Sequence, residues 1–240
     1  MSRCAWLAAT LAAIVAVVVP DAAVARSAPR RTVLSNERTV TRWGSPAAIE
    51  AIRAAPSARS RAVGRLHWTT EDGYAEVYVV LERYVNATGT PWLKIRIPRR
   101  PNGAIGWVHA QALGRLTEVR DEIVIDSAAE TLTLYRRGHR ILRVPVGVGK
   151  PSTPTPPGHF WIREKIVALD HNPLYGPYAL GTSDYSTLTD WPGGGVVGIH
   201  GTDEPWLVPG TPSHGCVRLR NGDITRLYKL VSVGTPVLIR

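Results

Sequence analysis

Cysteine is scarce in this chain of 240 residues, since Cys4 and Cys216 are the only two. Two cysteines so far apart do not build the disulfide framework of a small secreted domain, and they lack the paired spacing of a structural zinc site. Metal binding is an alternative only through Cys216 with His200 and His214, which is one ligand short of a four-coordinate zinc site. We therefore expect no metal ion and no organic cofactor.

Long hydrophobic runs are also missing. The one extended apolar stretch, residues 5–19, follows Arg3 and ends at Pro20, so it is shorter than the roughly 20 apolar residues that cross a membrane. A cationic start, a short apolar run and small residues before Arg26 are typical of a secretory signal peptide. We predict that residues 1–25 are a signal peptide and that the mature protein is secreted.

Cleavage of this signal peptide changes the meaning of the remaining cysteine. It removes Cys4 and leaves Cys216 as the only thiol of the mature chain. Exported proteins normally pair their cysteines, so an unpaired one indicates either a reactive thiol or an intermolecular bridge.

Acidic residues are few. There are 19 of them against 29 lysines and arginines, which gives a net charge of +10. No lysine follows a serine at the Ser-x-x-Lys spacing, which excludes a penicillin-type serine transpeptidase. The arginines are scattered along the chain and the protein is predicted to be exported, so we expect no nucleic-acid partner. A basic exported protein is instead attracted to anionic polymers.

The first half of the mature chain is patterned for short strands. Residues 26–38 are polar and basic without periodicity, and we predict a tether there. Residues 39–116 contain strand-like runs, such as residues 74–81 and 92–97, which are rich in β-branched and aromatic residues. Turn-forming Gly, Pro and Asn residues separate these runs, so we predict a small β-barrel-like domain.

Residues 121–240 form a second β-rich region. Three strands and the hairpin turn between the last two are predicted from alternating or continuous apolar runs at residues 122–126, 131–135 and 141–148. Residues 172–195 are rich in Gly, Pro, Tyr and Asp, and so long a loop inside a domain is typical of a lid or a substrate wall. A short helix is predicted over residues 224–230 with Asp223 as its N-cap. The predicted fold class is mainly β.

The stretch around Cys216 has the residue types of a nucleophilic site. Only a thiolate attacks well, so a catalytic cysteine needs an imidazole or another cation close by. His214 precedes Cys216 by two residues and therefore projects to the same face of an extended chain. His200 ends an apolar run that is typical of a neighbouring strand. The backbone N–H groups of Gly215 and Cys216 are candidate oxyanion donors.

With these residues in view, the second region resembles the catalytic domain of the L,D-transpeptidases. The family signature is a histidine, a spacer, and then Ser-His-Gly-Cys with a downstream Arg and Asn. The matching positions here are His200, Ser213, His214, Gly215, Cys216, Arg218 and Asn221. The spacer of twelve residues is short for the family. Position 201 is Gly where some members have Ser, which leaves the third triad member open, a backbone carbonyl being one candidate.

The resemblance implies that the protein cross-links peptidoglycan in the cell wall or periplasm. Cys216 attacks the third residue of a donor tetrapeptide stem, releases D-alanine, and passes the resulting thioester to the amine of an acceptor stem. His200 is the implied proton donor and acceptor and His214 supports the oxyanion or the substrate, although these two roles are exchangeable. The implied substrate contacts are Ser213, Gly215, Arg218, Asn221 and Tyr175, with a loop-holding role also open for Arg218 and Asn221. Carbapenem-type inhibitors are implied as ligands.

The first region resembles a bacterial Src-homology-3-like domain. The resemblance depends on residues 52–57 and 63–66 and on the late Gly106, Trp107 and Val108. It implies wall attachment or substrate positioning without chemistry. A small β-domain that only packs against the second region is the alternative.

Two other functions stay open at this point. Water in place of the acceptor amine makes the same site a wall hydrolase or carboxypeptidase. If both regions only adhere, the protein is a non-catalytic wall-binding protein. The replacement of Cys216 by alanine separates the enzyme from the adhesin.

Overall fold

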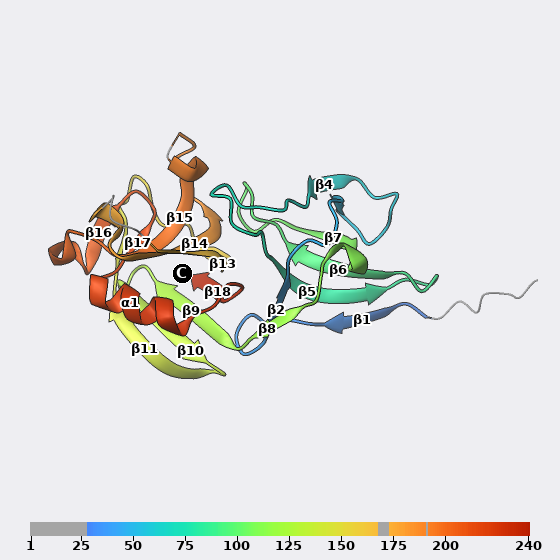
Figure 1. Ribbon diagram of the computed structural model, residues 1–240, viewed down its shortest axis with the longest axis horizontal. Helices are drawn as coiled ribbons and strands as arrows, with labels where there is room; N and C mark the ends of the chain where they lie inside the picture. Colours follow the sequence, from blue (N-terminus) through green and yellow to red (C-terminus); the bar gives the residue numbers. More distant parts are fainter. Residues whose placement is uncertain (1–27, 168–172, 191) are drawn as a thin grey trace, which may run out of the picture.

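The computed structural model describes residues 28–167, 173–190 and 192–240. The predicted signal peptide and the first two residues of the predicted tether lie outside the described residues. The described strands form two sheets, which Figure 1 shows side by side along the long axis of the molecule. The predicted mainly β class is confirmed. No helix in the described part of the chain has the length and apolar character needed to cross a membrane.

The first sheet has eight strands in the order β4-β3-β7-β6-β5-β2-β8, with β1 paired to β5. The strands are β1 (Arg30–Val33), β2 (Thr41–Gly44), β3 (Ala51–Arg53), β4 (Ala62–Arg65), β5 (Tyr78–Val85), β6 (Pro91–Arg96), β7 (Ile105–His109) and β8 (Thr117–Val119), with a 3-10 helix at Ala110–Ala112. β5 pairs with β6 along one edge and with β2 and then β1 along the other. The core of this sheet is formed around the buried Ile52, Leu66, Val80, Ile95 and Val108.

The tether predicted for residues 26–38 is wrong over its described part. Arg30–Val33 pair antiparallel with β5, from Arg30 opposite Val85 to Val33 opposite Glu82. Asn36 Oδ1 then accepts hydrogen bonds from three successive backbone N–H groups, which fixes the turn into β2. All four residues of β1 are exposed, so this edge strand has no apolar face and no sequence periodicity to reveal it.

The second sheet has ten strands in the order β11-β10-β9-β18-β13-β14-β15-β17-β12-β16. The strands are β9 (Asp121–Asp126), β10 (Thr131–Arg136), β11 (His139–Pro145), β12 (Gly147–Gly149), β13 (Gly158–Val167), β14 (Tyr178–Tyr185), β15 (Val196–His200), β16 (Gly210–Ser213), β17 (Val217–Arg218) and β18 (Pro236–Ile239). The helix α1 (Asn221–Leu230) packs Ile224 and Leu227 into the same core as Ile123, Ile162 and Ile199. Short 3-10 helices lie at Pro173–Tyr175, Pro192–Gly195 and Pro205–Leu207.

The structure differs from the prediction at the long loop and at the helix start. Residues 172–195 are not one loop, because β14 (Tyr178–Tyr185) lies within them and runs between β13 and β15. This strand contains Gly181, Ser183 and Asp184, so its sequence lacks the apolar pattern that identifies a buried strand. The helix begins at Asn221 with Arg220 at the N-cap, one turn earlier than the predicted Asp223.

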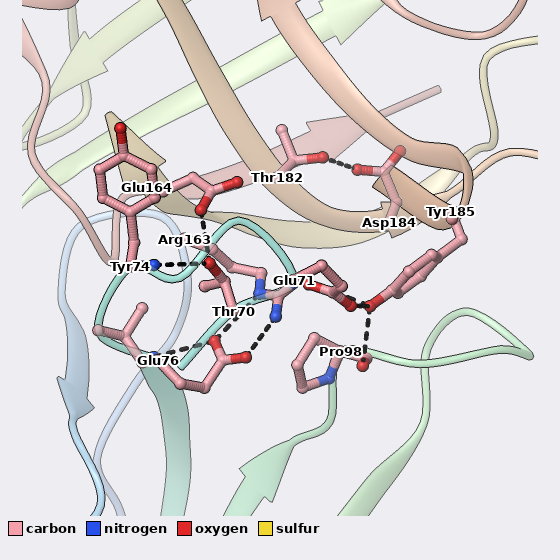
Figure 2. A network of polar contacts seen from close by, with 12 residues as sticks. Thr70, Glu71, Tyr74, Glu76, Pro98, Arg163, Glu164, Thr182, Asp184 and Tyr185 are labelled. Carbon is pink, nitrogen blue, oxygen red and sulfur yellow. Dashed lines mark hydrogen bonds and ion pairs between the residues drawn. The ribbon is translucent and has the colours of Figure 1, made fainter. Parts of the chain in front are cut away.

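Buried polar side chains join the two sheets (Figure 2). Arg163 on β13 is 3% exposed and forms an ion pair with Glu76, which is 2% exposed, and a second ion pair with Glu71 at 2.9 Å. Thr70 Oγ1 donates to Glu164 Oε2 at 2.7 Å. Removal of one partner from a buried ion pair leaves an uncompensated charge and costs about 3–5 kcal/mol. This network therefore fixes how the first sheet sits on the second.

Glu164 gives a test of this interface through the pH dependence of stability. Burial raises the pKa of Glu164 from its ordinary 4.5 to about 7. A carboxyl with a raised folded-state pKa contributes stability below its unfolded pKa, and this contribution is lost as the pH rises through about 7. We expect Glu164→Gln, which keeps an oxygen for Thr70 and cannot ionise, to raise Tm by about 2–4 °C more at pH 8 than at pH 5.

Scanning calorimetry of the wild type and the variant at the two pH values measures this difference. Glu82→Gln is the matched control, because a hydrogen bond from Lys94 lowers the pKa of Glu82 and the pH dependence of its contribution has the opposite sign. An equal change in Tm at pH 5 and pH 8 for Glu164→Gln would show that Glu164 does not titrate in this range.

Candidate active site

Most of the predicted site residues meet at one small cavity of about 70 Å³ on the second sheet. β15 ends at His200, and the turn between β16 and β17 carries Cys216 beside it, because β15 and β17 are parallel neighbours. The cavity is lined by Leu174, Tyr175, Ser186, Val196, Val197, His200, Ser213, His214, Cys216 and Arg218. Six of the eight predicted residues are in this lining. Gly215 lies in the turn itself, and Asn221 lies outside the lining.

Ser213 shapes the turn that carries Cys216. Its hydroxyl donates to Cys216 O at 2.5 Å and accepts from Gly215 N–H at 3.1 Å. Thr155 holds the same turn from the other side, donating to Gly215 O at 2.9 Å. Gly215 has φ +126°, and a Cβ there would lie 3.0 Å from the Cβ of Ser186, so glycine is required. The Ser213 hydroxyl is therefore occupied by the turn, whereas the sequence predicted a substrate contact.

His200 is held in one tautomer by the backbone. Its Nδ1 lies 2.6 Å from Gly201 O, and a carbonyl oxygen only accepts, so Nδ1 carries the proton and Nε2 bears the lone pair. The Tyr175 ring packs edge-on against the imidazole, with 4.7 Å between the ring centroids. Burial, opposed by the Gly201 carbonyl and aided by the charge of Arg218, lowers the pKa of His200 to about 4. His200 is therefore a neutral base at physiological pH.

The Cys216 sulfur is in its neutral form in the resting site. Burial raises the pKa of the Cys216 thiol above its ordinary 9.0, although the Gly198 N–H, 3.4 Å from Sγ, acts in the opposite direction. A thiol beside a neutral imidazole differs from the ion pair that the sequence suggested. Such a pair requires that the proton leave the sulfur during attack rather than before it.

His214 precedes Cys216 by two residues and has a lysine as its neighbour. Lys150 Nζ is 2.9 Å from His214 Nε2, where an ammonium group donates to the ring nitrogen. Lys150 directly follows β12, whose backbone pairs with both β16 and β17. This cation contacts His214, which lines the cavity, and no motif in the sequence indicated it.

Arg218 and Asn221 hold the chain that surrounds the cavity. Arg218 Nη1 forms an ion pair with Glu204 at 2.8 Å while the side chain lines the cavity. Asn221 Oδ1 accepts from Thr202 N–H at 2.9 Å, which ties the start of α1 to the segment that follows His200. Of the two roles considered for Asn221, this placement favours holding the loop over contacting a substrate.

The first sheet also contacts the wall of the cavity. Arg100, on the loop between β6 and β7, donates to the carbonyl oxygens of Ser186, Leu188 and Gly194 at 2.9–3.1 Å. On the same loop the Asn102 side chain forms two hydrogen bonds with the backbone of Tyr185. Because Ser186 lines the cavity, these contacts connect the first sheet to the candidate active site.

Two other observations concern the rest of the described surface. A wider cleft of about 750 Å³ between residues 36–39 and the second sheet contains none of the predicted site residues. In the described residues, no group of three or more His, Cys, Asp or Glu side chains is arranged to hold a metal ion.

A cysteine thiol and a histidine base in one cavity define a site of the cysteine-nucleophile class. Comparison with protein families matches residues 120–239 to YkuD, the L,D-transpeptidase catalytic domain. The chain belongs to this family of L,D-transpeptidase catalytic domains.

Two curated relatives illustrate the similarity. The YkuD protein of Bacillus subtilis is 34% identical over 119 residues, which are 49% of this chain and 64% of that protein. L,D-transpeptidase 1 of Mycobacterium tuberculosis is 32% identical over 126 residues, which are 48% of each protein. The matched region therefore spans 64% of the first relative and 48% of the second.

Solved structures show similarity of the same kind. LdtMt1 in complex with imipenem is 20% identical and covers 93% of this chain and 87% of that chain, with a TM-score of 0.43. The catalytic domain of the Enterococcus faecium L,D-transpeptidase is 28% identical and covers 50% of this chain and 95% of that chain, with a TM-score of 0.37. With TM-scores below 0.5, the family assignment depends on the match of residues 120–239.

Proposed function

We propose that this protein is an exported L,D-transpeptidase that cross-links peptidoglycan stems through a thioester on Cys216. The observation that supports this function is the shared cavity of the Cys216 thiol and the His200 ring, whose Nδ1 is held by Gly201 O. The family membership of residues 120–239 supports the same reaction. The proposed donor and acceptor are both peptidoglycan stem peptides, the donor being a tetrapeptide.

Acylation begins with a proton transfer to His200. Nε2 takes the thiol proton as the Cys216 sulfur attacks the carbonyl carbon of the third stem residue. The imidazolium then gives this proton to the nitrogen of the terminal D-alanine, the C–N bond breaks, and D-alanine leaves as an amine. The products of this half-reaction are a Cys216 thioester and a neutral His200.

Deacylation repeats these steps in the reverse order. A neutral side-chain amine of the acceptor stem attacks the thioester carbonyl and passes one proton to His200. The C–S bond then breaks and the sulfur recovers the proton from the imidazolium. A new amide bond joins the third residues of the two stems.

The oxyanion of each tetrahedral intermediate needs a hydrogen-bond donor. The Gly215 N–H, one of the two donors suggested by the sequence, already donates to the Ser213 hydroxyl. Of the two backbone N–H groups suggested by the sequence, that of Cys216 therefore remains as a candidate oxyanion donor. His214 and its neighbour Lys150 are the candidate side-chain donors.

Incubation of residues 26–240 with defined stem peptides tests the proposed reaction. Mass spectrometry should detect an adduct of one tripeptide acyl group on Cys216, free D-alanine, and a dimer joined through the third residues. A stem that ends at the third residue is the matched control substrate, because it has no D-alanine to release and should give no adduct.

The same experiment separates the alternatives. Release of D-alanine with tripeptide as the only peptide product would identify a carboxypeptidase. Absence of both adduct and product, with retention on isolated cell walls, would identify a wall-binding protein and overturn the proposal.

Carbapenem-type inhibitors are proposed as covalent ligands of the same sulfur. A β-lactam carbonyl is an acyl donor for the thiol in the same way as the stem carbonyl. Intact-protein mass spectrometry should show the addition of one carbapenem to the wild type, and an unchanged protein mass after prolonged incubation would contradict the assignment.

For the N-terminal part we propose a signal peptide at residues 1–25 and a Src-homology-3-like domain at residues 39–116 that contacts the wall. The apolar run of residues 5–19 supports the signal, and the small strand-rich sheet with its own core supports the domain. N-terminal sequencing of the protein secreted from a bacterial host should begin at Arg26. A secreted protein whose sequence begins at Met1 would contradict the removal of a signal peptide.

Arg100 links this first domain to the proposed reaction. Its hydrogen bonds hold the backbone of Ser186 and its neighbours at the cavity wall, so Arg100→Ala should displace the wall and not the nucleophile. Small displacements of a substrate-positioning segment are expensive in rate, and we expect kcat/KM for the donor stem to fall about tenfold, mainly through KM. Steady-state kinetics with the tetrapeptide donor measures this effect.

The matched control is Arg99→Ala, which removes the same charge from the neighbouring exposed position. Arg99 lines a separate cavity, whose other walls include Arg163 of the second sheet, and forms no hydrogen bond within the described residues. Equal losses in the two variants would show that charge, and not the hold on the wall, is responsible.

A further inference from the structure

The pairing between β14 and β15, the strand beside β17, contains a bulge at a position that the proposed mechanism does not use. β14 and β15 pair with Gly181 opposite Gly198 and with Tyr185 opposite Val196. Three residues of β14, Thr182, Ser183 and Asp184, therefore stand opposite the single residue Val197. A bulge of this kind interrupts the ladder of backbone hydrogen bonds and redirects side chains.

The Thr182 hydroxyl takes the place of the missing ladder donor. Thr182 Oγ1 donates to Val197 O at 2.6 Å, and it is also within hydrogen-bond distance of Asp184 Oδ1 (Figure 2). A hydroxyl has one proton, and a backbone carbonyl only accepts. Both contacts are hydrogen bonds at the same time only if Asp184 supplies the second proton, so the arrangement requires a protonated carboxylic acid.

The surroundings of Asp184 agree with a neutral carboxyl. Its side chain is 0% exposed, and Oδ2 has no hydrogen-bond partner in the described part of the chain. Burial raises the pKa of Asp184 to about 7, against an ordinary value of 3.8. An isolated buried carboxylate is far more costly than a buried acid.

The peptide unit that receives this hydrogen bond also contacts the nucleophile. Val197 O belongs to the peptide group whose N–H, that of Gly198, points at Cys216 Sγ from 3.4 Å. A donor on the carbonyl side of a peptide group polarises the group and strengthens the hydrogen bond that its N–H donates. The chain of contacts therefore runs from Asp184 through Thr182 and the peptide group to the sulfur.

We propose that Thr182 and Asp184 are positioning residues for the Cys216 sulfur, acting through the peptide group between Val197 and Gly198. The protonated Asp184 directs the Thr182 hydroxyl to Val197 O, which favours the thiolate that forms during attack. When Asp184 ionises, the Thr182 proton turns to the carboxylate, and the new negative charge disfavours the thiolate. This inference builds on the proposed role of Cys216 as the nucleophile.

The charged and titratable groups around Asp184 leave the sulfur as its main electrostatic partner. The negative charge of Asp184 acts to raise the pKa of Cys216. On β13, Arg163 pairs with Glu76 and Glu71, while Glu164 binds Thr70, so these groups have their partners in the first domain. On the same elements, Lys165 of β13 donates to the carbonyl oxygens of Tyr228 and Val231, His200 of β15 is opposite Ala179, and Tyr228 of α1 stacks on Tyr178. The other titratable side chains of these elements are His159 on β13 and Asp223, Arg226 and Lys229 on α1.

The test measures the Cys216 thiol directly, by the rate of alkylation with iodoacetamide between pH 6 and pH 10. Thr182→Val removes the hydroxyl and should slow alkylation by about 3–10-fold at pH 6, where Asp184 is protonated, and by less at pH 8, where Asp184 is ionised. Thr182→Ser keeps the hydroxyl and should follow the wild type. Thr235→Val is the matched control, because Thr235 is equally buried and its hydroxyl has no partner in the described residues.

Asp184→Asn tests the acid separately. The amide N–H₂ group donates to Thr182 Oγ1 in place of the acid and cannot ionise, so the relay stays intact while the charge is lost. The alkylation rate of Asp184→Asn divided by that of the wild type should be close to one at pH 6 and should increase about 2–5-fold by pH 8. This pH-dependent ratio is a readout that a purely structural role of Asp184 would leave flat. Melting temperatures of all variants report whether each one is folded.

Three results would overturn the inference. These are a wild-type alkylation profile for Thr182→Val, an equal impairment in Thr182→Ser or Thr235→Val, and a D184N ratio that does not change with pH. If Thr182→Val fails to fold, the alkylation rates of Thr182→Ser and Asp184→Asn still test the inference. The reagent needs no stem peptide, so failure of the proposed transpeptidase reaction and failure of this relay are observed independently.

Discussion

Replacement of Cys216 by alanine should abolish transpeptidation, with a loss of at least about 10³-fold in the rate of dimer formation. The thioester needs a nucleophile at this position, and Cys216 is the only free cysteine in the described residues. The cavity is also lined by the serines Ser186 and Ser213, but the Ser213 hydroxyl is bound to the turn and Ser186 Oγ accepts from Leu188 N–H. Neither hydroxyl is arranged to replace the sulfur.

The measurement is the yield of dimer and free D-alanine from the tetrapeptide donor, together with the protein mass. Cys216→Ser is the matched variant, since it preserves the shape of the turn and changes only the nucleophile. Both variants should melt within a few degrees of the wild type and lose the stem adduct. Dimer formation at the wild-type rate by Cys216→Ala would remove the basis of the proposed function.

Replacement of His200 by alanine should reduce kcat/KM by about 10²–10⁴-fold, because it removes the base that takes the thiol proton. The loss is large because burial raises the pKa of the thiol, so little thiolate exists near neutral pH without the base. The buried ring leaves a cavity, and added imidazole should restore part of the rate. His159→Gln, on an exposed position of β13, is the control and should leave the rate unchanged.

The pH profile of the wild type tests the same assignment. A general base acts in its neutral form, which is present above its pKa. With the pKa of His200 lowered to about 4, kcat/KM should persist at pH 5 and should fall to half only near pH 4. A half-loss near pH 6.5 would show that the active base is a histidine with an ordinary pKa. His214→Ala should cause a smaller loss of kcat/KM than His200→Ala and should leave the fall of kcat/KM at acid pH unchanged. This result would distinguish the two histidines.

The sequence predicted most residues that line the candidate site, because their signal is local. His200 ends an apolar run and Cys216 lies in a motif of four residues, so each can be recognised from its neighbours in the sequence. The structure places both residues at one cavity. The role of Ser213 was not predictable, since nothing in a sequence shows that its hydroxyl is consumed by a turn. Lys150 and Thr182 reach the site through pairings with distant strands, and the residues next to them in the sequence carry no sign of this.

The sequence was a weaker guide to strands that bury little apolar surface. β1 is exposed along its whole length, and β14 buries the polar residues Thr182, Ser183 and Asp184, so neither has the alternation by which strands are recognised. β5 begins at Tyr78 rather than at Tyr74, because the preceding residues turn to present Glu76 to Arg163 across the interface. Long-range polar pairing of this kind is not encoded in local periodicity.

The covalent connection between the two sheets is a single residue, Arg120, between Val119 and Asp121. The family boundary at residue 120 therefore coincides with a one-residue link between the two sheets and not with a separable module. A truncated chain that starts there would retain every cavity-lining side chain, yet it would expose Trp161 and Arg163 to water and lose the grip of Arg100 on the cavity wall. Inhibitor screens and crystallisation trials on such a fragment would therefore examine a cavity whose wall is held less firmly than in the longer chain.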